Sequence, residues 1–437
     1  MDKKIVIIGA GPAGLGAAYR LQELGYQNWE IYEKDDYIGG LAASFKDDMG
    51  FVWDVGGHVL FSRYRYFDGL LTERFDGELI EHERRAYIRI RDRLVPYPFQ
   101  NNIKYLPPDI YSECLNSLVK VQDKKADSGN FEEWILYTFG EGIAKYFMFP
   151  HNWKLWAHPL KIMSKDWVSG SISAVKIEQL ERNSSQDKAD ISWGMNKRFK
   201  YPLYGGIGGL WQKFLPLMKG HINFKKKVVK INVDKKEITF FNGESADYGV
   251  IINTMPLDDF ISKANLTPLS DEAAKLKHNG IFVVGFGIKG SCPKDRNWMY
   301  FPENNCPFYR VSYISNYSPH NVPSHDYFSL LAETSYSEFK PVSKDRIIEE
   351  TLRGLINCDL LKEEEKKNIV STYSIDVPYA YPVPTLERDG ALQRIQSYLS
   401  SNDIYSCGRF GGWKYEASSI DDSVNQGKEA IDALLLK

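Results

Sequence analysis

Three glycines near the first residue have the spacing of a phosphate-binding turn. Gly9, Gly11 and Gly14 follow the apolar run Ile5–Ile8 in the pattern G-x-G-x-x-G, and a helical segment comes next. In such a turn the glycines permit a tight reversal, a close approach to a pyrophosphate, and close packing of helix on strand. A second apolar strand ends in Glu33, where a carboxylate can accept the ribose hydroxyls of an adenosine. The pattern predicts a dinucleotide site.

Further glycine-rich turns favour FAD over NAD as that dinucleotide. Gly39-Gly40 precedes Leu41, Gly56-Gly57 precedes His58, and Gly408-Arg409 follows a late strand. Paired glycines let the backbone approach a flat ring or a ribose. A late strand–glycine–helix passage brings backbone N–H groups to a second phosphate. His58 is then either a simple turn residue or a neighbour of the flavin.

The sequence offers little other catalytic machinery. No Ser–His–Asp or Cys–His grouping stands out, and no His/Glu spacing suggests a metal site. The five cysteines are odd in number and lack C-x-x-C spacing, which indicates a reduced, cytoplasmic protein. Difficult chemistry would therefore fall to the bound cofactor, while polar side chains bind and orient the substrate.

Composition narrows the class of protein further. The chain has 437 residues, 43% of them hydrophobic and 26% charged, with a net charge of −2. These values predict a globular protein of two or three lobes with no electrostatic reason to bind nucleic acid. We find no apolar run long enough for a membrane span and no signal-peptide layout, and the oligomeric state stays open.

The order of strand-like and helical segments predicts an α/β fold. We expect a Rossmann-like FAD-binding domain from residues 1–65, 203–262 and 400–437. A mostly helical substrate and nucleotide domain is expected at 66–202, and a mixed β-sheet over the substrate cavity at 263–399.

Several local elements can be predicted within these domains. Helical spacing covers residues 108–120 and 131–147, with Asp109 and Asn130 as possible N-caps. Residues 222–232 and 236–242 alternate like a hairpin with its turn near Asp234-Lys235. Residues 280–335 form short strand-like runs, and a final helix is expected from about residue 423. Residues 183–191 are predicted to be a polar loop.

The chain resembles the UDP-galactopyranose mutase family, and its eukaryotic-type branch more than the shorter bacterial branch. Long aperiodic strings in family order carry this resemblance: Trp53–Ser62, Val95–Asn102, His151–Ala157, Gly205–Trp211, Trp298–Arg310, Ser315–Pro319, Tyr381–Arg388 and Gly408–Glu416. The resemblance implies non-covalent FAD that is active when reduced. It also implies that flavin N5 attacks the anomeric carbon of a nucleotide-sugar, so that the ring opens and recloses as a furanose for polysaccharide biosynthesis.

The resemblance also assigns roles to individual residues. His58 matches a histidine whose loop moves with the flavin redox state, and Arg310 matches an arginine that clamps the pyrophosphate. The positions that match the cofactor site are Gly9, Gly11, Gly14, Glu33, Leu41, Gly56, Gly57, Val228, Gly408, Arg409 and Ser423. The positions that match the nucleotide-sugar site are Tyr97, Gln100, Asn152, Trp156, Asn196, Tyr300, Arg310, Tyr317, Tyr381 and Tyr415.

Two departures from the family pattern concern the substrate. Ser171 stands where the family has a second pyrophosphate arginine, and Ser419-Ile420 replace a late Asn-Gln pair. Lys197 or Arg198 could supply the missing cation. Otherwise the substrate is a different nucleotide-sugar, such as a deoxy, amino or heptose sugar, rather than UDP-galactose.

Other functions stay open at this point. An FAD-dependent amine oxidase or desaturase shares the cofactor domain, although such pockets tend to be apolar. A non-catalytic nucleotide-sugar sensor is a third alternative. NADPH or NADH is a candidate reductant, because Arg84 falls where eukaryotic-type members receive the 2′-phosphate of NADPH. A solvated basic face explains Arg84 equally well.

Overall fold

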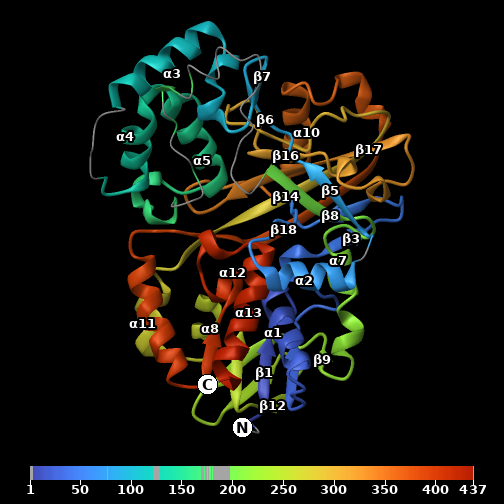
Figure 1. The fold of residues 1–437 in the computed structure, drawn as a ribbon, viewed down its shortest axis with the longest axis vertical. Coiled ribbons are helices and arrows are strands. Elements are labelled where there is room, and N and C mark those ends of the chain that lie inside the picture. Colours follow the sequence, from blue (N-terminus) through green and yellow to red (C-terminus); the bar gives the residue numbers. More distant parts are fainter. Residues whose placement is uncertain are drawn as a thin grey trace.

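The computed structural model describes most of the chain, namely residues 3–75, 77–121, 128–168, 172, 175, 177–178, 180 and 197–436. A parallel sheet lies in one lobe, a long mixed sheet crosses the middle, and a helical lobe lies on the far side (Figure 1). The two described ends of the chain lie together at the base of the first lobe (Figure 1). Among these residues no helix is both long and apolar enough to cross a bilayer.

The parallel sheet forms the centre of the first lobe. Its strand order is β19-β13-β1-β2-β9, and β1 is buried along its whole length. The strands are β1 (Ile5–Ile8), β2 (Trp29–Tyr32), β9 (Ile222–Asn223), β13 (Val250–Asn253) and β19 (Ile404–Ser406). All four pairings are parallel. This arrangement confirms the predicted Rossmann-like architecture, because apolar strands buried on both faces are typical of parallel sheets.

Two helices pack closely beside this sheet. They are α1 (Pro12–Glu23) and α13 (Ile420–Leu435), which lie side by side (Figure 1). A Cβ built on Gly16 of α1 would lie 2.4 Å from the carbonyl oxygen of Val424 in α13. The helix α13 begins three residues earlier than predicted, because Ser419 and Asp422 form a capping box at its start.

A small antiparallel sheet and several short elements complete this lobe. The sheet contains β10 (Val228–Asn232), β11 (Glu237–Phe240) and β12 (Ser245–Asp247), so a hairpin is present as predicted. Residues 222–223 instead join the parallel sheet. The remaining helices here are α2 (Arg65–Arg74), α7 (Gly209–Gln212), α8 (Leu257–Lys263), α9 (Ser270–Ala273), α11 (Arg388–Ser400) and α12 (Gly408–Gly411).

The mixed sheet has seven strands in the order β18-β14-β17-β16-β15-β6-β7. Their bounds are β6 (Ala86–Ile90), β7 (Arg93–Pro96), β14 (Lys277–Lys289), β15 (Trp298–Tyr300), β16 (Arg310–Ser312), β17 (Tyr327–Tyr336) and β18 (Ile369–Val383). The helix α10 (Ile347–Asn357) packs on β14. Two strands, β6 and β7, come from the segment that the sequence assigned to a mostly helical domain. Two-stranded pairs also join β3 (Ser44–Lys46) to β4 (Val52–Asp54) and β5 (Leu79–Glu83) to β8 (Arg198–Pro202).

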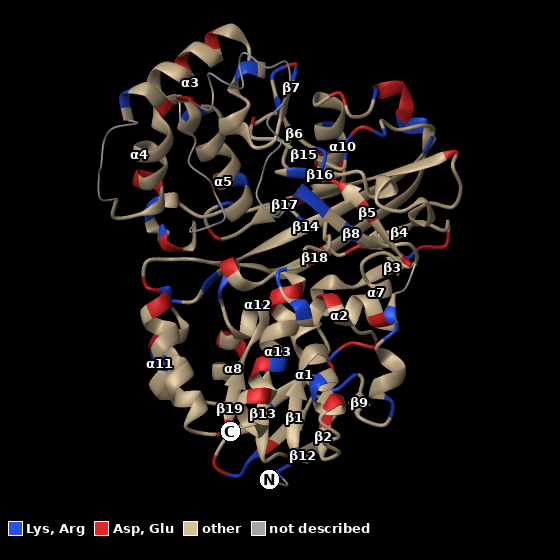
Figure 2. Ribbon diagram, viewed as in Figure 1, with Lys and Arg blue, Asp and Glu red and all other residues tan. Residues whose placement is uncertain are grey.

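The helical lobe consists of α3 (Pro108–Val121), α4 (Phe131–Ile143), a π-helical segment (Ala144–Met148) and α5 (Phe149–Trp156). Asn130 caps α4 as predicted, and its side chain accepts a bond of 3.0 Å from the Glu133 amide. The prediction for Asp109 was wrong, because α3 already begins at Pro108. Proline is favoured in the first helical turn, where its missing N–H is not needed. Lysine, arginine, aspartate and glutamate are interspersed over both lobes (Figure 2).

Candidate functional site

A cavity of about 420 Å³ opens at the carboxyl ends of β1 and β2. Most of the predicted cofactor residues line it, namely Gly9, Gly11, Glu33, Leu41, Val228, Gly408, Arg409 and Ser423. His58 and Ile420 line it as well. Residues from the beginning, middle and end of the chain therefore meet at the edge of the sheet where dinucleotides bind in folds of this type.

The glycine turn has the close contacts that its sequence predicts. Gly9 has a φ of 102°, which favours glycine, and a Cβ on Gly14 would lie 2.0 Å from the Gly9 carbonyl oxygen. Gly14 thus packs helix on strand and lies outside the cavity lining. The helix α1 starts at Pro12 without a side-chain cap, so the first N–H groups of the helix are available to a phosphate.

The Glu33 carboxylate is held firmly at the end of β2. It accepts bonds from the Ala10 amide at 2.7 Å and from the Asp35 amide at 3.0 Å. Burial raises the pKa of Glu33, while the two amide bonds oppose that rise. Each carboxylate oxygen has a further lone pair, so the group can also accept the hydroxyls of a ribose. The residues present fit FAD.

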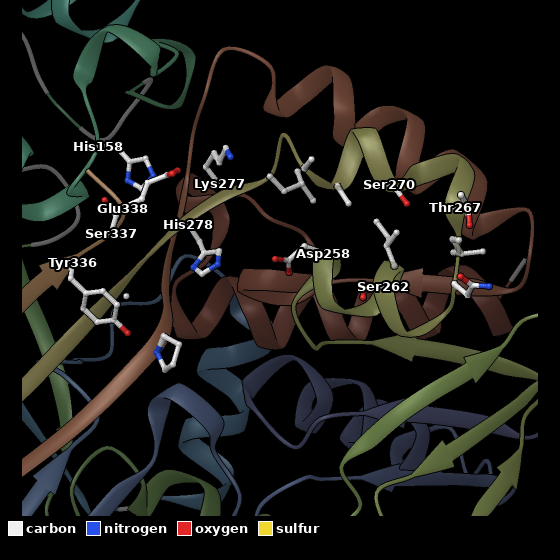
Figure 3. Close-up of a pocket in the computed structure, with 18 residues that line it drawn as sticks. His158, Asp258, Ser262, Thr267, Ser270, Lys277, His278, Tyr336, Ser337 and Glu338 are labelled. Carbon is white, nitrogen blue, oxygen red and sulfur yellow. The ribbon is translucent and has the colours of Figure 1, made fainter. Parts of the chain in front are cut away.

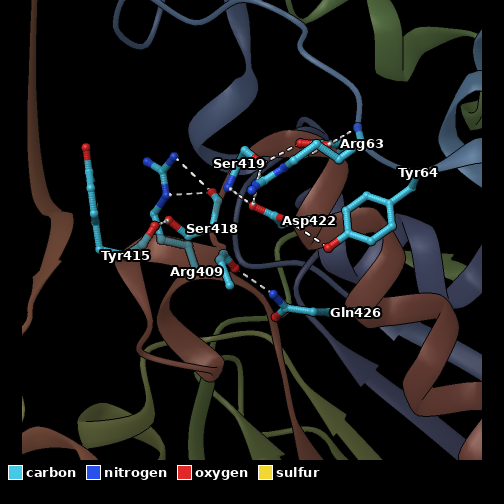
Figure 4. Close-up of polar contacts among 10 residues, drawn as sticks. Arg63, Tyr64, Arg409, Tyr415, Ser418, Ser419, Asp422 and Gln426 are labelled. Carbon is cyan, nitrogen blue, oxygen red and sulfur yellow. Dashed lines mark hydrogen bonds and ion pairs between the residues drawn. The ribbon is translucent and has the colours of Figure 1, made fainter. Parts of the chain in front are cut away.

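Arg409 links the cavity to the tyrosine-rich strings (Figure 4). Its Nε and Nη2 donate to the Ser418 carbonyl at 3.3 and 3.2 Å, and its guanidinium lies 5.8 Å from the ring centre of Tyr381. The hydroxyl of Ser418 donates to the Tyr415 carbonyl at 2.8 Å. One short turn therefore connects a cavity-lining arginine to two of the predicted substrate tyrosines.

Ser419, one of the departures from the family pattern, has a structural role. Its amide donates to Asp422 at 3.1 Å. The same carboxylate accepts from Arg63 at 2.6 Å and from the Tyr64 hydroxyl at 3.0 Å (Figure 4). This network ties the segment that follows His58 to the beginning of α13. Sequence reasoning did not find Arg63 and Tyr64.

Arg310 is held by Glu333, a residue that sequence reasoning missed. Arg310 Nε lies 3.0 Å from Glu333 Oε1, and Nη2 lies 2.7 and 2.8 Å from Oε1 and Oε2. The Glu333 side chain is fully buried and also accepts from the Gly57 amide at 2.7 Å and from the Tyr309 hydroxyl. The sequence could have indicated Glu333, because it is the single acidic residue within the largely apolar strand β17.

Aromatic rings surround this ion pair. Tyr309 and Tyr381 share a hydrogen bond of 3.0 Å between their hydroxyls. Tyr381 and Tyr415 lie 5.6 Å apart between ring centres, and Trp156 lies 4.7 Å from Tyr415. The Tyr97 and Tyr300 rings are also neighbours, at 5.1 Å.

The other predicted substrate residues occupy varied places. Asn152 is buried on α5, where it accepts from Trp156 Nε1 at 3.1 Å and donates to the Met148 carbonyl at 2.7 Å. Gln100 is also buried. Tyr317 packs against Phe199 and Tyr201 and has no exposed surface.

The region of the missing arginine is only partly described by the structure. Asn196 and Ser171 lie outside the described residues. Arg198 is largely exposed and pairs with Glu81 at 2.9 Å. Arg84 lies closer to the aromatic cluster, with its guanidinium 4.7 Å from the Tyr97 ring centre and 5.3 Å from that of Trp298.

His58 lies at the junction between the cavity and the ion pair. Burial lowers the pKa of His58 to about 3, and the positive charges of Arg409 and Arg310 add to that effect. The imidazole is therefore neutral at physiological pH. Its Nδ1 is buried and has no hydrogen-bond partner among the residues described.

A second cavity, of about 760 Å³, lies between α8, α9 and the mixed sheet (Figure 3). His158 and Glu338 line one end, and Thr267 and Ser270 line the other. No predicted site residue within the described ranges lines it. The first cavity therefore brings together the predicted cofactor residues, whereas none of the predicted substrate residues within the described ranges lines either cavity.

Comparisons with known proteins agree with this geometry. The profile of the family "flavin containing amine oxidoreductase" matches residues 12–435. A crystal structure of reduced UDP-galactopyranose mutase superposes with a TM-score of 0.96 at 40% identity, over 99% of this chain and 94% of that one. A putative protoporphyrinogen oxidase from Exiguobacterium sp. 255-15 has a TM-score of 0.77 at 16% identity, over 100% of this chain and 99% of the other, which shows a shared fold only.

Two curated desaturases are similar to this chain over short stretches. The zeta-carotene desaturase of Solanum lycopersicum is 41% identical over 70 residues, which is 16% of this chain and 12% of that protein. The 15-cis-phytoene desaturase of Glycine max is 39% identical over 84 residues, or 19% and 15% of the respective chains. The matched region thus spans less than a fifth of either desaturase.

Proposed function

This chain belongs to the flavin-containing amine oxidoreductases and, within them, to the UDP-galactopyranose mutase family, and we propose that it interconverts the pyranose and furanose forms of a nucleotide-sugar. UDP-galactose is the first candidate substrate, and UDP-galactofuranose, for polysaccharide synthesis in the cytoplasm, is the proposed product. FAD, in its reduced state, would supply the nucleophile, its N5, to the anomeric carbon of the sugar.

One observation carries the proposal, namely the network around Glu333. Glu333 Oε1 accepts a hydrogen bond of 2.7 Å from the Gly57 amide and one of 2.7 Å from Arg310 Nη2. Gly57 is next to His58, which lines the cofactor cavity. A fixed arginine beside the flavin site is what displacement of a pyrophosphate requires, since negative charge develops on the leaving group. An apolar amine or polyene substrate would gain nothing from it.

The leaving group would contact the free edge of Arg310. The bonds to Glu333 use Nε and Nη2, which leaves Nη1 outside the ion pair. The buried carboxylate also holds the guanidinium in place before the substrate arrives, so that little reorganisation is needed during reaction. The hydroxyls of Tyr300, Tyr381 and Tyr415 would hold the pyrophosphate and the sugar.

The nucleotide would lie on the α5 side of the cluster. Tyr97, Gln100, Asn152, Trp156 and Asn196 are the proposed contacts. Asn152 is oriented by its bond with Trp156 Nε1 at 3.1 Å, and an amide in that position retains one N–H for a base or ribose. Neutral His58 would face the flavin without adding a positive charge that competes with Arg310.

The cofactor residues have proposed roles that follow from their places. The α1 amides would bind the pyrophosphate of FAD, and Glu33 would bind its ribose. Arg409 on α12 and Ser423 on α13 would approach the flavin from the C-terminal part of the chain. NADPH or NADH is the proposed reductant, with Arg84 as the candidate contact because its guanidinium lies 4.7 Å from the Tyr97 ring.

An anaerobic assay tests the proposal. Purified protein with dithionite-reduced FAD is given UDP-galactose and related sugars of other nucleotides, including deoxy, amino and heptose sugars. We expect ring isomerisation of at least one nucleotide-sugar with reduced enzyme and none with oxidised enzyme. In a parallel aerobic assay, oxygen consumption with an amine or polyene, together with no turnover of any nucleotide-sugar in the anaerobic one, would favour the oxidase or desaturase alternative. Nucleotide-sugar binding without turnover would favour the sensor.

A further inference from the structure

The Lys154 side chain is an ammonium group in the interior of the protein. Lys154 lies on α5 and is 4% exposed. Lysine is rarely buried to this extent, because an ammonium group loses its hydration unless other groups replace it. Its burial therefore calls for a set of partners that compensates the charge.

Those partners all come from one hairpin. Lys154 Nζ donates to the carbonyls of Phe301 at 3.0 Å, Cys306 at 2.8 Å and Phe308 at 3.2 Å. It also contacts the Glu303 carbonyl and lies 3.4 Å from Cys306 Sγ. These partners are backbone carbonyl oxygens and a thiol, not a carboxylate. The ammonium group therefore holds the backbone of the hairpin in place rather than a single side chain.

The same hairpin connects two proposed pyrophosphate ligands. Residues 301–309 join β15 to β16, and the Phe301 amide donates to the Tyr309 carbonyl at 3.0 Å. Tyr300 and Arg310 are direct partners across this antiparallel pair. A shift of the hairpin relative to α5 would therefore move both residues together.

The helix α5 carries the nucleotide half of the proposed site. Asn152 and Trp156 lie two residues on either side of Lys154. His151, on the same helix, packs edge-on against Tyr300 at 5.1 Å. Lys154 thus connects the two halves of the site through polar bonds to the backbone.

We propose that Lys154 is a positioning residue that fixes the nucleotide helix α5 against the 301–309 hairpin, so that the base and the pyrophosphate of the substrate are bound at a set separation. The inference rests on the proposed function. It predicts that binding on the α5 side and binding on the hairpin side are energetically coupled, and that the coupling requires the ammonium group.

The test compares the affinities of uridine and UDP in Lys154→Met, which keeps the apolar stem and removes the charge. We expect the affinity for uridine to change by less than about 3-fold, while the gain in affinity from uridine to UDP falls about 10-fold or more. Lys145→Met is the matched control, because Lys145 precedes α5, is exposed and pairs with Glu113 at 2.8 Å. Lys145→Met should retain the full gain in affinity from uridine to UDP.

The outcomes are distinguishable. A purely structural lysine would lower the melting temperature but leave the gain from uridine to UDP unchanged, and that result would overturn the inference. If the unmodified enzyme binds neither UDP nor uridine, the proposed function itself has failed.

A second measurement needs no variant. Should Lys154→Met fail to fold, hydrogen exchange is followed in the unmodified protein with uridine alone. Coupling predicts slower exchange of the backbone amides in residues 301–309, which uridine does not touch. Slower exchange confined to α5 would contradict the inference.

Discussion

At the scale of single residues, the site depends on charges held by buried partners. Arg310 is fixed by a carboxylate with no exposed surface. The same carboxylate accepts from the Gly57 amide. Removing one partner of such a pair leaves the other charge uncompensated, which costs more than the pair itself contributes.

Arg310→Ala should cut turnover about 100-fold or more, which corresponds to roughly 2.7 kcal/mol of barrier. Under the proposed mechanism the pyrophosphate would leave with less charge stabilisation in the variant, and steady-state kinetics with reduced enzyme check this loss. Arg198→Ala is the control, since Arg198 is exposed and paired with Glu81. Near-normal turnover of the Arg310 variant would remove this residue from the site.

Glu333→Gln should also reduce turnover, although the side chain is proposed not to touch the substrate. The amide keeps the shape but loses the charge that compensates Arg310, so we expect a fall of about 10-fold or more together with a lower melting temperature. Kinetics and thermal unfolding measured on one preparation check both effects. An unchanged turnover rate in Glu333→Gln would mean that the Glu333 charge is not needed to hold Arg310 in place.

The pKa of His58 makes stability depend on pH in a defined window. The folded-state pKa of about 3 lies below the usual value of 6.5. The unfolded chain therefore binds a proton as pH falls through 6.5, whereas the folded chain does not. Stability is lost progressively between pH 6.5 and 3, by roughly 2 kcal/mol at pH 5.

Denaturant unfolding at pH 7.5 and 5.0 tests this dependence. The drop in unfolding free energy should be smaller in His58→Gln than in the unmodified protein. His325→Gln is the control, because the His325 side chain is 94% exposed. If the unfolding free energy falls equally in the His58 variant and in the unmodified protein, the imidazole is not held neutral in the folded state.

At the scale of elements, close packing of α1 on α13 shapes the cofactor cavity. Gly16→Ala places a Cβ 2.4 Å from the Val424 carbonyl oxygen, so the helices must separate. We expect destabilisation by about 1–3 kcal/mol and weaker retention of FAD. Gly69→Ala is the control, since a Cβ there meets nothing within 4 Å. Denaturant unfolding and the flavin content are measured for both variants. Equal unfolding free energies and equal FAD contents in Gly16→Ala and Gly69→Ala would argue against the close contact.

The elements also show how far the sequence could predict the fold and the site. The glycine fingerprint, the buried strands and the Asn130 cap depend on local patterns, and the structure reproduces them. Glu333 and Lys154 were missed because their partners lie far away in the chain, and no local pattern reports a long-range contact. The strand β18 was missed for a local reason, since Pro378 and Pro382 interrupt its pattern.

At the scale of the whole molecule, the cofactor cavity joins distant parts of the chain. Gly9, Val228 and Ser423 all line it. A ligand that binds only the folded state stabilises that state by mass action, by about 2.7 kcal/mol when its concentration is 100 times Kd. Protein stripped of flavin should therefore melt at a lower temperature and recover on addition of FAD. Equal melting temperatures with and without FAD would contradict a cofactor role for this cavity.

A trapping experiment tests the proposed mechanism, in which N5 of reduced FAD would attack the anomeric carbon of the sugar. Reduced enzyme is incubated with UDP-galactose and cyanoborohydride in the absence of oxygen, and the mass of the extracted flavin is measured by mass spectrometry. We predict a flavin that carries one reduced hexose residue, formed only with reduced enzyme and about 100-fold more slowly in Arg310→Ala. If the flavin stays unmodified while the nucleotide-sugar is turned over, the proposed attack by flavin N5 on the sugar is wrong.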